Sequence, residues 1–483
     1  MRSPSGSNNS ALSRATSLVC RIAALAIASA ALLATSSPVE SADGAGEQRR
    51  PNIVVILADD MGYADVGFHG CRDIPTPNLD KLARQGVRCS DGYVSHPFCS
   101  PTRAALITGR YQQRFGHENN PKFDPAEEQT GLPLSEITIA QVLKSAGYAT
   151  GAVGKWHLGA APHFHPMQRG FDEYFGLRGG GHDYFKTDMT TETKEYLIPL
   201  DRNGEPVELT EYLTDVLSRE AAAFVRRHHD HPFFLYLAYN APHTPLQVSQ
   251  KYLDRVASIE DPQRRSYAAM VSAMDDGVGL VLSALEELKL DQQTLVFFLS
   301  DNGGPVGING SSNEPFRGAK GQVFEGGVRV PFVVRWTGHL PAGATYARPV
   351  TCRDILPTAA AVSGATCPPN CVWDGVDLIP YLRGENAQPP HKILFWRTGG
   401  GAAFAVRAER DKLVKIGNNP AMLFNLEVDP SETTDIAADH ADRVGELTTL
   451  LDAWNRQLVP PRWESPRPAR PAQNRQRQQE RPN

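Results

Sequence analysis

The chain has 483 residues, of which 41% are hydrophobic and 21% charged, and these proportions exclude a disordered or fibrous protein. A chain of this length and composition buries a core large enough for more than one layer of secondary structure. Its formal net charge of -5 gives no global attraction for nucleic acid or an anionic membrane surface. We therefore expect no nucleic-acid partner, and any anion site must be built from local clusters of Lys, Arg and His.

The N-terminus has the pattern of a targeting segment. An apolar run over residues 22–34 follows several arginines and precedes a stretch of small residues, which predicts a signal peptide over residues 1–42. We place its cleavage site between Ala34 and Ala42. The run is too short to span a bilayer comfortably, although a membrane anchor is the alternative. We find no other long apolar stretch, and we expect a secreted or periplasmic protein without stable membrane insertion.

Export makes disulfide bonds possible among the seven cysteines. Cys367 and Cys371 are close enough for a local bridge, whereas Cys71 and Cys89 either pair or stay buried and free. Cys99 is flanked by turn and helix signals, and its spacing matches neither a disulfide framework nor a Cys-x-x-Cys metal site. Cys99 therefore needs an explanation of its own.

Continuous apolar runs of strand length begin at Asn52, Phe233 and Thr294, and each ends abruptly in polar residues. They are typical of buried parallel strands. Helical patterns lie between them. In residues 267–285 the apolar residues are spaced by three and four, and in residues 135–147 Ser135 is a plausible N-cap and Gly147 a stop. Strand and helix in alternation predict an α/β sandwich with a mainly parallel sheet.

The C-terminal part has a different character. Residues 404–416 and 421–430 have the patterns of antiparallel strands, and an amphipathic helix closes the fold before residue 460. We therefore predict a catalytic domain over residues 48–383 and a smaller antiparallel-sheet domain over residues 384–460. Residues 461–483 are rich in Pro, Arg and Gln without apolar periodicity, which predicts a disordered basic tail.

Functional groups in such a sheet gather beyond the carboxyl ends of its strands, where helix N-termini point. Asp59, Asp60, His243, Asp301 and Asn302 all occupy such positions. A single acid after a strand is as readily a helix cap as a ligand. An all-oxygen set suits a hard divalent cation.

Cys99 itself is expected at the start of a helix. Ser100 is a candidate N-cap, Pro101 suits the first turn, and the apolar residues that follow supply a buried face. The positive end of the helix dipole then favours an anion, and Arg103, one turn along, adds charge-assisted donors.

The run from Cys99 to Arg110 resembles the sulfatase signature, Cys-x-Pro-(Ser/Thr)-Arg with a (Leu/Ile)-Thr-Gly-Arg ending, with Thr102 in place of the commoner Ser. This resemblance implies an alkaline-phosphatase-like fold and a cysteine that a formylglycine-generating enzyme converts to formylglycine. One hydroxyl of the hydrated aldehyde would attack sulfur and expel the alcohol, and the second would then expel sulfate. A plain serine would be trapped as its sulfate ester.

The resemblance also implies a metal centre and a sulfate shell. One calcium ion, with magnesium the less favoured choice, would bind Asp59, Asp60, Asp301, Asn302 and the modified Cys99.

In the sulfate shell, Lys155 would bind sulfate and orient the diol, and His157 would deprotonate its second hydroxyl. Arg103 would help to compensate the negative charge of the transition state and of the acids around the metal. His243 and Lys320 would contact sulfate and protonate the leaving oxygen. Taken without the signature, Lys155 and His157 are each more often a surface or core residue.

The resemblance implies a sulfuric-ester hydrolase acting on sulfated carbohydrates or aryl sulfates. Two alternatives stay open: a formylglycine-dependent phosphonate monoester or phosphodiester hydrolase on the same scaffold, and a non-catalytic protein that binds sulfated glycans. His117 and His182 are candidates for the leaving-group pocket, although ordinary loop positions explain both equally well. The run Gly179–Gly181 lacks the strand-to-helix context of a nucleotide-binding loop.

Overall fold

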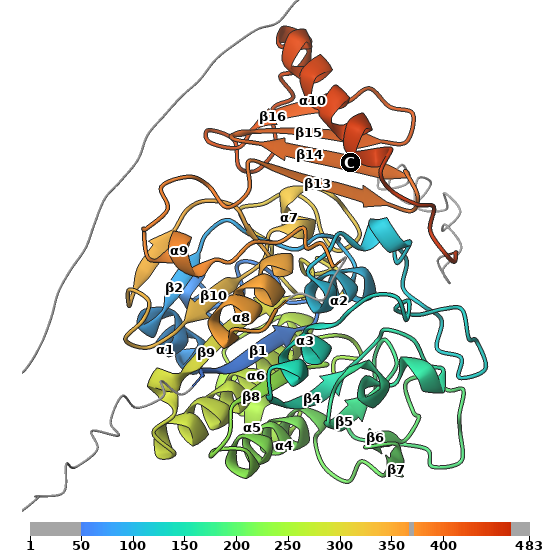
Figure 1. The fold of residues 1–483 in the computed structure, drawn as a ribbon, viewed down its shortest axis with the longest axis vertical. Coiled ribbons are helices and arrows are strands. Elements are labelled where there is room, and N and C mark those ends of the chain that lie inside the picture. The colour runs from blue at the N-terminus through green and yellow to red at the C-terminus, as the bar shows by residue number, and fades with distance from the viewer. Residues whose placement is uncertain (1–49, 367–370, 465–483) are drawn as a thin grey trace, which may run out of the picture. The chain divides into compact units, whose positions relative to one another are not determined.

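The computed structural model describes residues 50–366 and 371–464. Within these ranges the main element is a ten-stranded sheet in the order β11-β2-β10-β9-β1-β8-β4-β5-β6-β7 (Figure 1). Its strands are β1 (Asn52–Ala58), β2 (Val87–Cys89), β4 (Ala149–Lys155), β5 (Glu173–Leu177), β6 (Leu200–Arg202), β7 (Glu205–Val207), β8 (Phe233–Ala238), β9 (Thr294–Ser300), β10 (Phe332–Arg335) and β11 (Ala344–Tyr346). A separate pair joins β3 (Gly92–Tyr93) to β12 (Val350–Thr351).

The centre of the sheet is parallel, as the apolar runs predict. β1 pairs in parallel with β8 on one side and β9 on the other, so that Val55 lies between Tyr236 and Phe297. β4 extends the parallel set beyond β8, whereas β10 and β6 run antiparallel to their neighbours. Every residue of β1, β8 and β9 is buried, which explains why these strands are continuously apolar.

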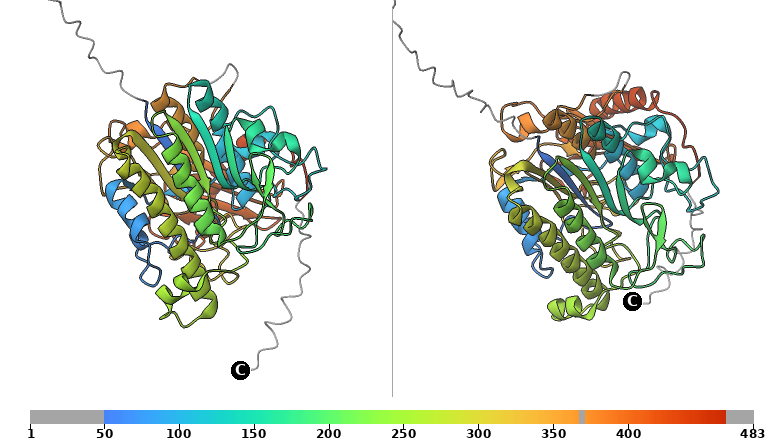
Figure 2. Two further views of the ribbon diagram at one scale, coloured as in Figure 1. Left: turned by 90° about the horizontal axis from the view of Figure 1, so that it is seen from below. Right: turned by 60° about the horizontal axis from the view of Figure 1, so that its bottom comes forward.

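Helices cover both faces of the sheet (Figures 1 and 2). Val54 and Ile56 point into a core that they share with α1 (Pro77–Gln85), α4 (Leu213–Arg227) and α6 (Pro262–Glu287), and α5 (Gln250–Leu253) packs on α6. Ile53 and Val55 point into the core of the other face, with α2 (Cys99–Thr108), α3 (Ile139–Ser145) and α8 (Ile355–Ser363). The short helices α7 (Glu325–Val328) and α9 (Ile379–Leu382) complete the set. The predicted α/β sandwich is confirmed.

The predicted stripe of the long helix is also confirmed, because Tyr267, Val271, Met274, Val278 and Val281 of α6 are all buried. By length and composition α6 is the one helix in the described ranges that qualifies as a membrane span, and 78% of its apolar window is buried inside the protein.

Two predicted N-caps are wrong. α3 is capped by Thr138, not Ser135, because the Thr138 hydroxyl accepts from Gln141 N and the Gln141 side chain accepts from Thr138 N. This reciprocal pair is a capping box, whose Thr-x-x-Gln spacing is visible in the sequence. α2 begins one residue before Ser100, with Phe98 in extended conformation at its N-cap and no side-chain cap.

The C-terminal part forms a four-stranded antiparallel sheet of β13 (Ile393–Thr398), β14 (Ala403–Ala408), β15 (Asp411–Ile416) and β16 (Met422–Asn425). Trp396 and Phe424 pack into the core of the larger sheet, while Leu413 and Leu423 pack with α10 (Ala441–Asn455). The buried Lys412 Nζ also donates to Glu325 Oε1 of α7 at 2.8 Å. The predicted antiparallel sheet and closing helix are thus present, while the exact domain boundaries stay predictions.

The predicted signal peptide, residues 1–42, lies outside the described residues, as do residues 465–483 of the predicted tail. The preceding residues 461–464 contact the predicted catalytic domain, so the prediction of disorder is wrong for these four residues. Trp463 Nε1 donates to Asn119 O at 3.1 Å, and its ring meets that of His117 edge-on at 4.7 Å.

The structure answers one of the two questions about disulfide pairing. Cys71, Cys89 and Cys352 are free, so the alternative in which Cys71 and Cys89 pair is wrong. Cys371 is disulfide-bonded, and Cys367 lies outside the described residues, so the bridge between these two stays a prediction.

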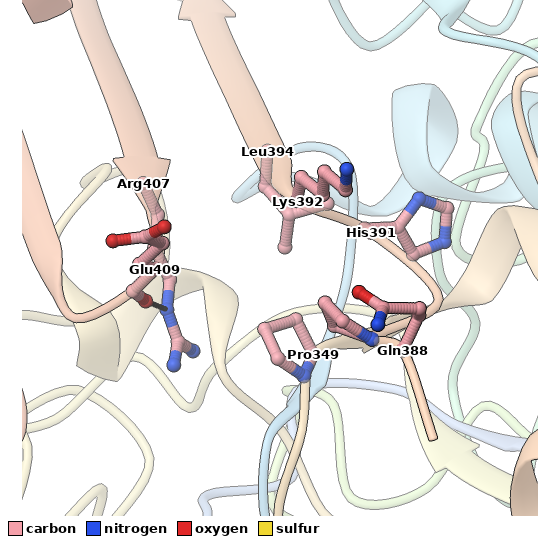
Figure 3. A pocket seen from close by; sticks show the side chains of 8 residues that line it. Pro349, Gln388, His391, Lys392, Leu394, Arg407 and Glu409 are labelled. Atoms are coloured by element: carbon pink, nitrogen blue, oxygen red, sulfur yellow. Dashed lines mark hydrogen bonds between the residues drawn. The ribbon is translucent and has the colours of Figure 1, made fainter. Parts of the chain in front are cut away.

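A cavity of about 280 Å³ lies beside the smaller sheet (Figure 3). It is lined by Pro349, Gln388, Pro389, His391, Lys392, Leu394, Arg407 and Glu409. Two of its polar side chains are already paired inside the protein, because Arg407 bonds to Asp91 and His391 to Asp354, each at 2.7 Å. None of its lining residues belongs to the predicted site.

Candidate active site

Four adjacent parallel strands deliver the predicted site residues to one edge of the sheet. In the order β9, β1, β8 and β4, their carboxyl ends are followed by Asp301 and Asn302, by Asp59 and Asp60, by His243, and by Lys155 as the last residue of β4. Because parallel strands end at the same edge, residues up to 243 positions apart in the sequence meet there.

Cys99 is the first residue of α2 and is 1% exposed. Its sulfur lies 3.1 Å from Lys320 Nζ and 3.6 Å from Asp59 Oδ1. Burial raises the pKa of the Cys99 thiol to about 12, although Lys155 and Lys320 oppose the rise. Cys99 is therefore a neutral thiol at physiological pH, which is a poor nucleophile in this unmodified form.

The three acids are buried and held by cations. Burial opposes the charge of Asp60, yet Lys320, 2.5 Å from Asp60 Oδ1, holds the pKa of Asp60 below its usual range. Burial and the neighbouring Asp59 raise the pKa of Asp301.

Two buried cations, Arg103 and Lys155, and the partly buried Lys320 balance these acids. Arg103 donates through Nε and Nη2 to Asp301 Oδ2 at 3.0 and 2.7 Å, and Lys155 donates to Asp59. Burial opposes the charge of Lys155, but Asp59 raises the pKa of its ammonium group. The site therefore keeps its cations charged and ready to bind an anion.

A strained backbone conformation determines the direction of two side chains, those of Asp60 and His157. Asp60 and His157 have φ of 67° and 59°, in the left-handed region that residues other than glycine seldom adopt. Successive side chains of an extended strand point to opposite faces, and a left-handed residue breaks that alternation. This turn lets Asp59 and Asp60 face the same ligand group. Strain of this kind is typical of functional sites.

The residues fit a divalent cation. One ligand atom each from Asp59, Asp60, Cys99 and His243 lies within 4.8 Å of all the others. Asn302 Oδ1 is buried without a hydrogen-bond partner among the described residues, while its Nδ2 donates to Asp60 Oδ1 at 2.7 Å. An unsatisfied buried carbonyl oxygen beside paired carboxylates is what an oxygen-liganded cation requires.

Asp301 borders this group. Its Oδ1 accepts from Asp60 N at 3.3 Å, and its Oδ2 is occupied by Arg103.

Both site histidines are neutral. Burial lowers the pKa of His243 to about 3, although Asp60 opposes the shift, and burial together with Lys155 holds the pKa of His157 well below its usual range. His243 Nδ1 lies 2.6 Å from Thr244 O, which can only accept, so Nδ1 carries the proton. The lone pair of Nε2 therefore faces Asp60 Oδ2, 3.6 Å away.

The two further histidine candidates have structural contacts. His117 Nε2 lies 2.6 Å from Ser100 Oγ, which in turn donates to His157 O at 2.6 Å. His182 contacts two backbone carbonyls, Asp183 O at 2.6 Å and Ile198 O at 2.7 Å. His117 thus supports the backbone behind Cys99, and His182 holds a loop in place.

Sequence reasoning missed two residues beside the site, Glu195 and Tyr196. They follow the run Gly179–Gly181 by about fifteen positions and fold back on it, so that Glu195 Oε1 accepts from Gly180 N at 2.5 Å. In the sequence, only the run of three glycines indicated that another segment approaches the backbone closely at this point.

Comparisons with known proteins agree with this geometry. The family model "Sulfatase" matches residues 51–365. N-acetylgalactosamine-6-sulfatase of Mus musculus is 37% identical over 73% of this chain and 70% of its own length, and arylsulfatase A of Bos taurus is 35% identical over 86% and 81%.

Among solved structures, Ps i-CgsB in complex with k-i-k-neocarrahexaose has a TM-score of 0.82 and 41% identity, covering 86% of this chain and 95% of its own. The phosphonate monoester hydrolase of Agrobacterium radiobacter shares the fold, with a TM-score of 0.65 and 22% identity over 85% of this chain and 96% of its own. The chain therefore belongs to the sulfatase family of sulfuric-ester hydrolases.

Proposed function

We propose that the chain is an exported, calcium-dependent sulfatase that hydrolyses sulfate esters of carbohydrates through a hydrated formylglycine formed from Cys99. The placement of Cys99 carries this proposal. Its sulfur lies at the N-terminus of α2, 3.1 Å from Lys320 Nζ, inside a buried ring of acids and cations. The signature from Cys99 to Arg110 supports its recognition by a formylglycine-generating enzyme.

Hydrated formylglycine supplies the nucleophile, and bound calcium supplies positive charge toward the sulfate oxygens. Asp59, Asp60, Asp301 and Asn302 would hold the cation through oxygen atoms, which both calcium and magnesium accept, and the resemblance to the sulfatase family favours calcium.

Residues of the chain would bind the sulfate, neutralise the acids and protonate the leaving oxygen. Lys155 and Lys320 donate hydrogen bonds to the sulfate oxygens, and Arg103 neutralises Asp301 so that the acids do not repel the substrate. The pair of His243 and Lys320 delivers a proton to the alcohol oxygen as its bond to sulfur breaks.

His157 completes the cycle as the base for the second hydroxyl at residue 99, whose proton it accepts as sulfate leaves. Its neutral imidazole is free to take that proton. Ser100 Oγ supports this role, because it donates to the carbonyl oxygen of His157 and so fixes the left-handed backbone there.

Two of the named proteins favour sulfated carbohydrates as substrates, whereas arylsulfatase A favours aryl sulfates. One is an N-acetylgalactosamine-6-sulfatase, and the structural neighbour at 41% identity is in complex with k-i-k-neocarrahexaose. Residues that grip sulfate do not discriminate between leaving groups, so the choice has to be tested directly.

The test measures the mass of the peptide that contains Cys99 and the rate at which the protein hydrolyses sulfate esters. The peptide containing Cys99, taken from protein made in a host with the modifying enzyme, should show the loss expected for conversion of a thiol to an aldehyde. The same protein should hydrolyse sulfated sugars in the presence of calcium, and Cys99→Ala should not. Faster turnover of phosphonate or phosphate diesters than of matched sulfate esters would favour the phosphonate hydrolase. Undiminished function of Cys99→Ala would favour the glycan-binding protein.

A further inference from the structure

The glycine run that the proposed mechanism does not use has a clear packing role. A Cβ on Gly179 would lie 2.7 Å from Glu195 Cγ, and one on Gly181 would lie 2.7 Å from the Tyr196 hydroxyl. A Cβ on Gly180 would lie 2.7 Å from His157 Nε2 and 3.1 Å from Glu195 Oε1. Three consecutive glycines are therefore needed to bring Glu195 and Tyr196 against the site.

Glu195 places a carboxylate beside the sulfate-binding residues. Its Oε1 accepts from Gly180 N at 2.5 Å, and although burial raises the pKa of this carboxyl, that hydrogen bond and the positive charge of Lys155 oppose the rise. A carboxylate is acceptor-only, so this side chain can bind hydroxyl and amide donors of a substrate.

Tyr196 presents an aromatic surface at the same place. Its side chain is 39% exposed, and its ring centroid lies 6.5 Å from that of His243, with 36° between the ring planes. An exposed aromatic ring beside the position of the leaving oxygen suits the apolar face of a sugar ring.

The loop that carries these residues is fixed to the segment that carries His243. Asn240 Nδ2 donates to His182 O at 3.2 Å, and the Tyr184 hydroxyl lies 2.7 Å from Asn240 O and 2.9 Å from His243 O. His182 in turn contacts Ile198 O, at the far end of the loop. Glu195 and Tyr196 thus belong to a wall that is held in place before substrate binds.

We propose that Glu195 and Tyr196 form the leaving-group subsite and select sugars that carry a hydroxyl, rather than a second sulfate, next to the scissile sulfate. This inference rests on the proposed function and specifies its substrate class. The carboxylate gains a hydrogen bond from a hydroxyl and repels a second sulfate, so attraction and repulsion act in the same direction.

The test compares Glu195→Gln with the wild type and with Glu192→Gln, an exposed acid of the same loop. The esters are N-acetylgalactosamine 6-sulfate, its 4,6-disulfate and 4-nitrophenyl sulfate. Glu195→Gln should lower kcat/KM for the monosulfate about 10- to 100-fold, mainly through KM, and raise the ratio of disulfate to monosulfate turnover. Equal ratios in Glu195→Gln and Glu192→Gln would overturn the proposal.

Binding separates a failure of the subsite from a failure of the proposed function. In the Cys99→Ala background, calorimetry with the monosulfate should show weaker binding for Glu195→Gln and for Tyr196→Ala, and intermediate binding for Tyr196→Phe. If these variants bind the monosulfate more weakly but the wild type does not hydrolyse it, the subsite is retained and the proposed reaction is rejected. Unchanged binding in both Glu195→Gln and Tyr196→Ala would reject the subsite.

Discussion

Arg103 Nη2 lies 2.7 Å from Asp301 Oδ2, and both side chains are completely buried. The pair joins the helix that begins at Cys99 to the loop that follows β9. Burial costs both charges their hydration, so each depends on the other for compensation.

Arg103→Met should therefore lower the free energy of unfolding by about 3–5 kcal/mol, because it leaves a buried carboxylate uncompensated. Denaturant unfolding in the presence of a chelator measures this cost without a contribution from metal binding. The double variant with Asp301→Asn should recover most of the loss. An additive double variant would contradict the pairing.

Unmodified Cys99 should resist alkylation in the native protein. It is 1% exposed, and burial raises the pKa of its thiol to about 12, so almost no thiolate is present at neutral pH. Iodoacetamide followed by peptide mass analysis should label the more exposed Cys71 first and Cys99 only after denaturation. Labelling of native Cys99 at the rate of Cys71 would show that the site is open.

Calcium should stabilise the folded protein. If the cation binds only the native state, unfolding should cost about 2.7 kcal/mol more at a free calcium concentration 100 times the dissociation constant. Thermal unfolding with and without chelator measures the shift. Asp60→Asn, which removes a ligand charge, should lose most of it, and an undiminished shift in this variant would place calcium elsewhere.

Gly180→Ala should impair catalysis without unfolding the protein. The added methyl group would lie 2.7 Å from His157 Nε2 and displace it, and displacements of about 1 Å cost up to about 100-fold in rate. Gly445→Ala is the matched control, because its methyl group meets open space in α10 and should add about 0.5–1 kcal/mol of stability. Full activity in Gly180→Ala would show that His157 tolerates the shift.

Asp275 should make stability depend on pH. Burial raises its pKa to about 6 in the folded protein, against 3.8 as the ordinary value. The folded state therefore binds the proton of Asp275 more tightly than the unfolded state does. The stability that this proton adds is fully present below about pH 4 and is lost as the pH rises through 6. The loss amounts to roughly 3 kcal/mol. Asp275→Asn should show a shallower decline over this window in unfolding titrations, and an identical decline would assign it to other groups.

The sequence was sufficient to predict the central strands that begin at Asn52, Phe233 and Thr294, together with the cluster at their ends. Parallel strands end at one edge, so Asp59, Asp301 and His243 had to be neighbours wherever their strands paired. Glu195 was beyond such reasoning, because its position depends on a loop that folds back on Gly180 without periodicity. Ser100 was misread as a cap because its hydroxyl bonds to His157 O, 57 residues away, which local spacing does not reveal.

The burial of α2 determines whether Cys99 is modified before or after the chain folds. All ten residues from Cys99 to Thr108 are buried once the sheet has formed. An enzyme that reads this segment and alters Cys99 must therefore act while the chain is still unfolded. Rapid folding would seal an unconverted thiol inside the protein, so the specific activity of a preparation would record how the rates of folding and modification compared during synthesis.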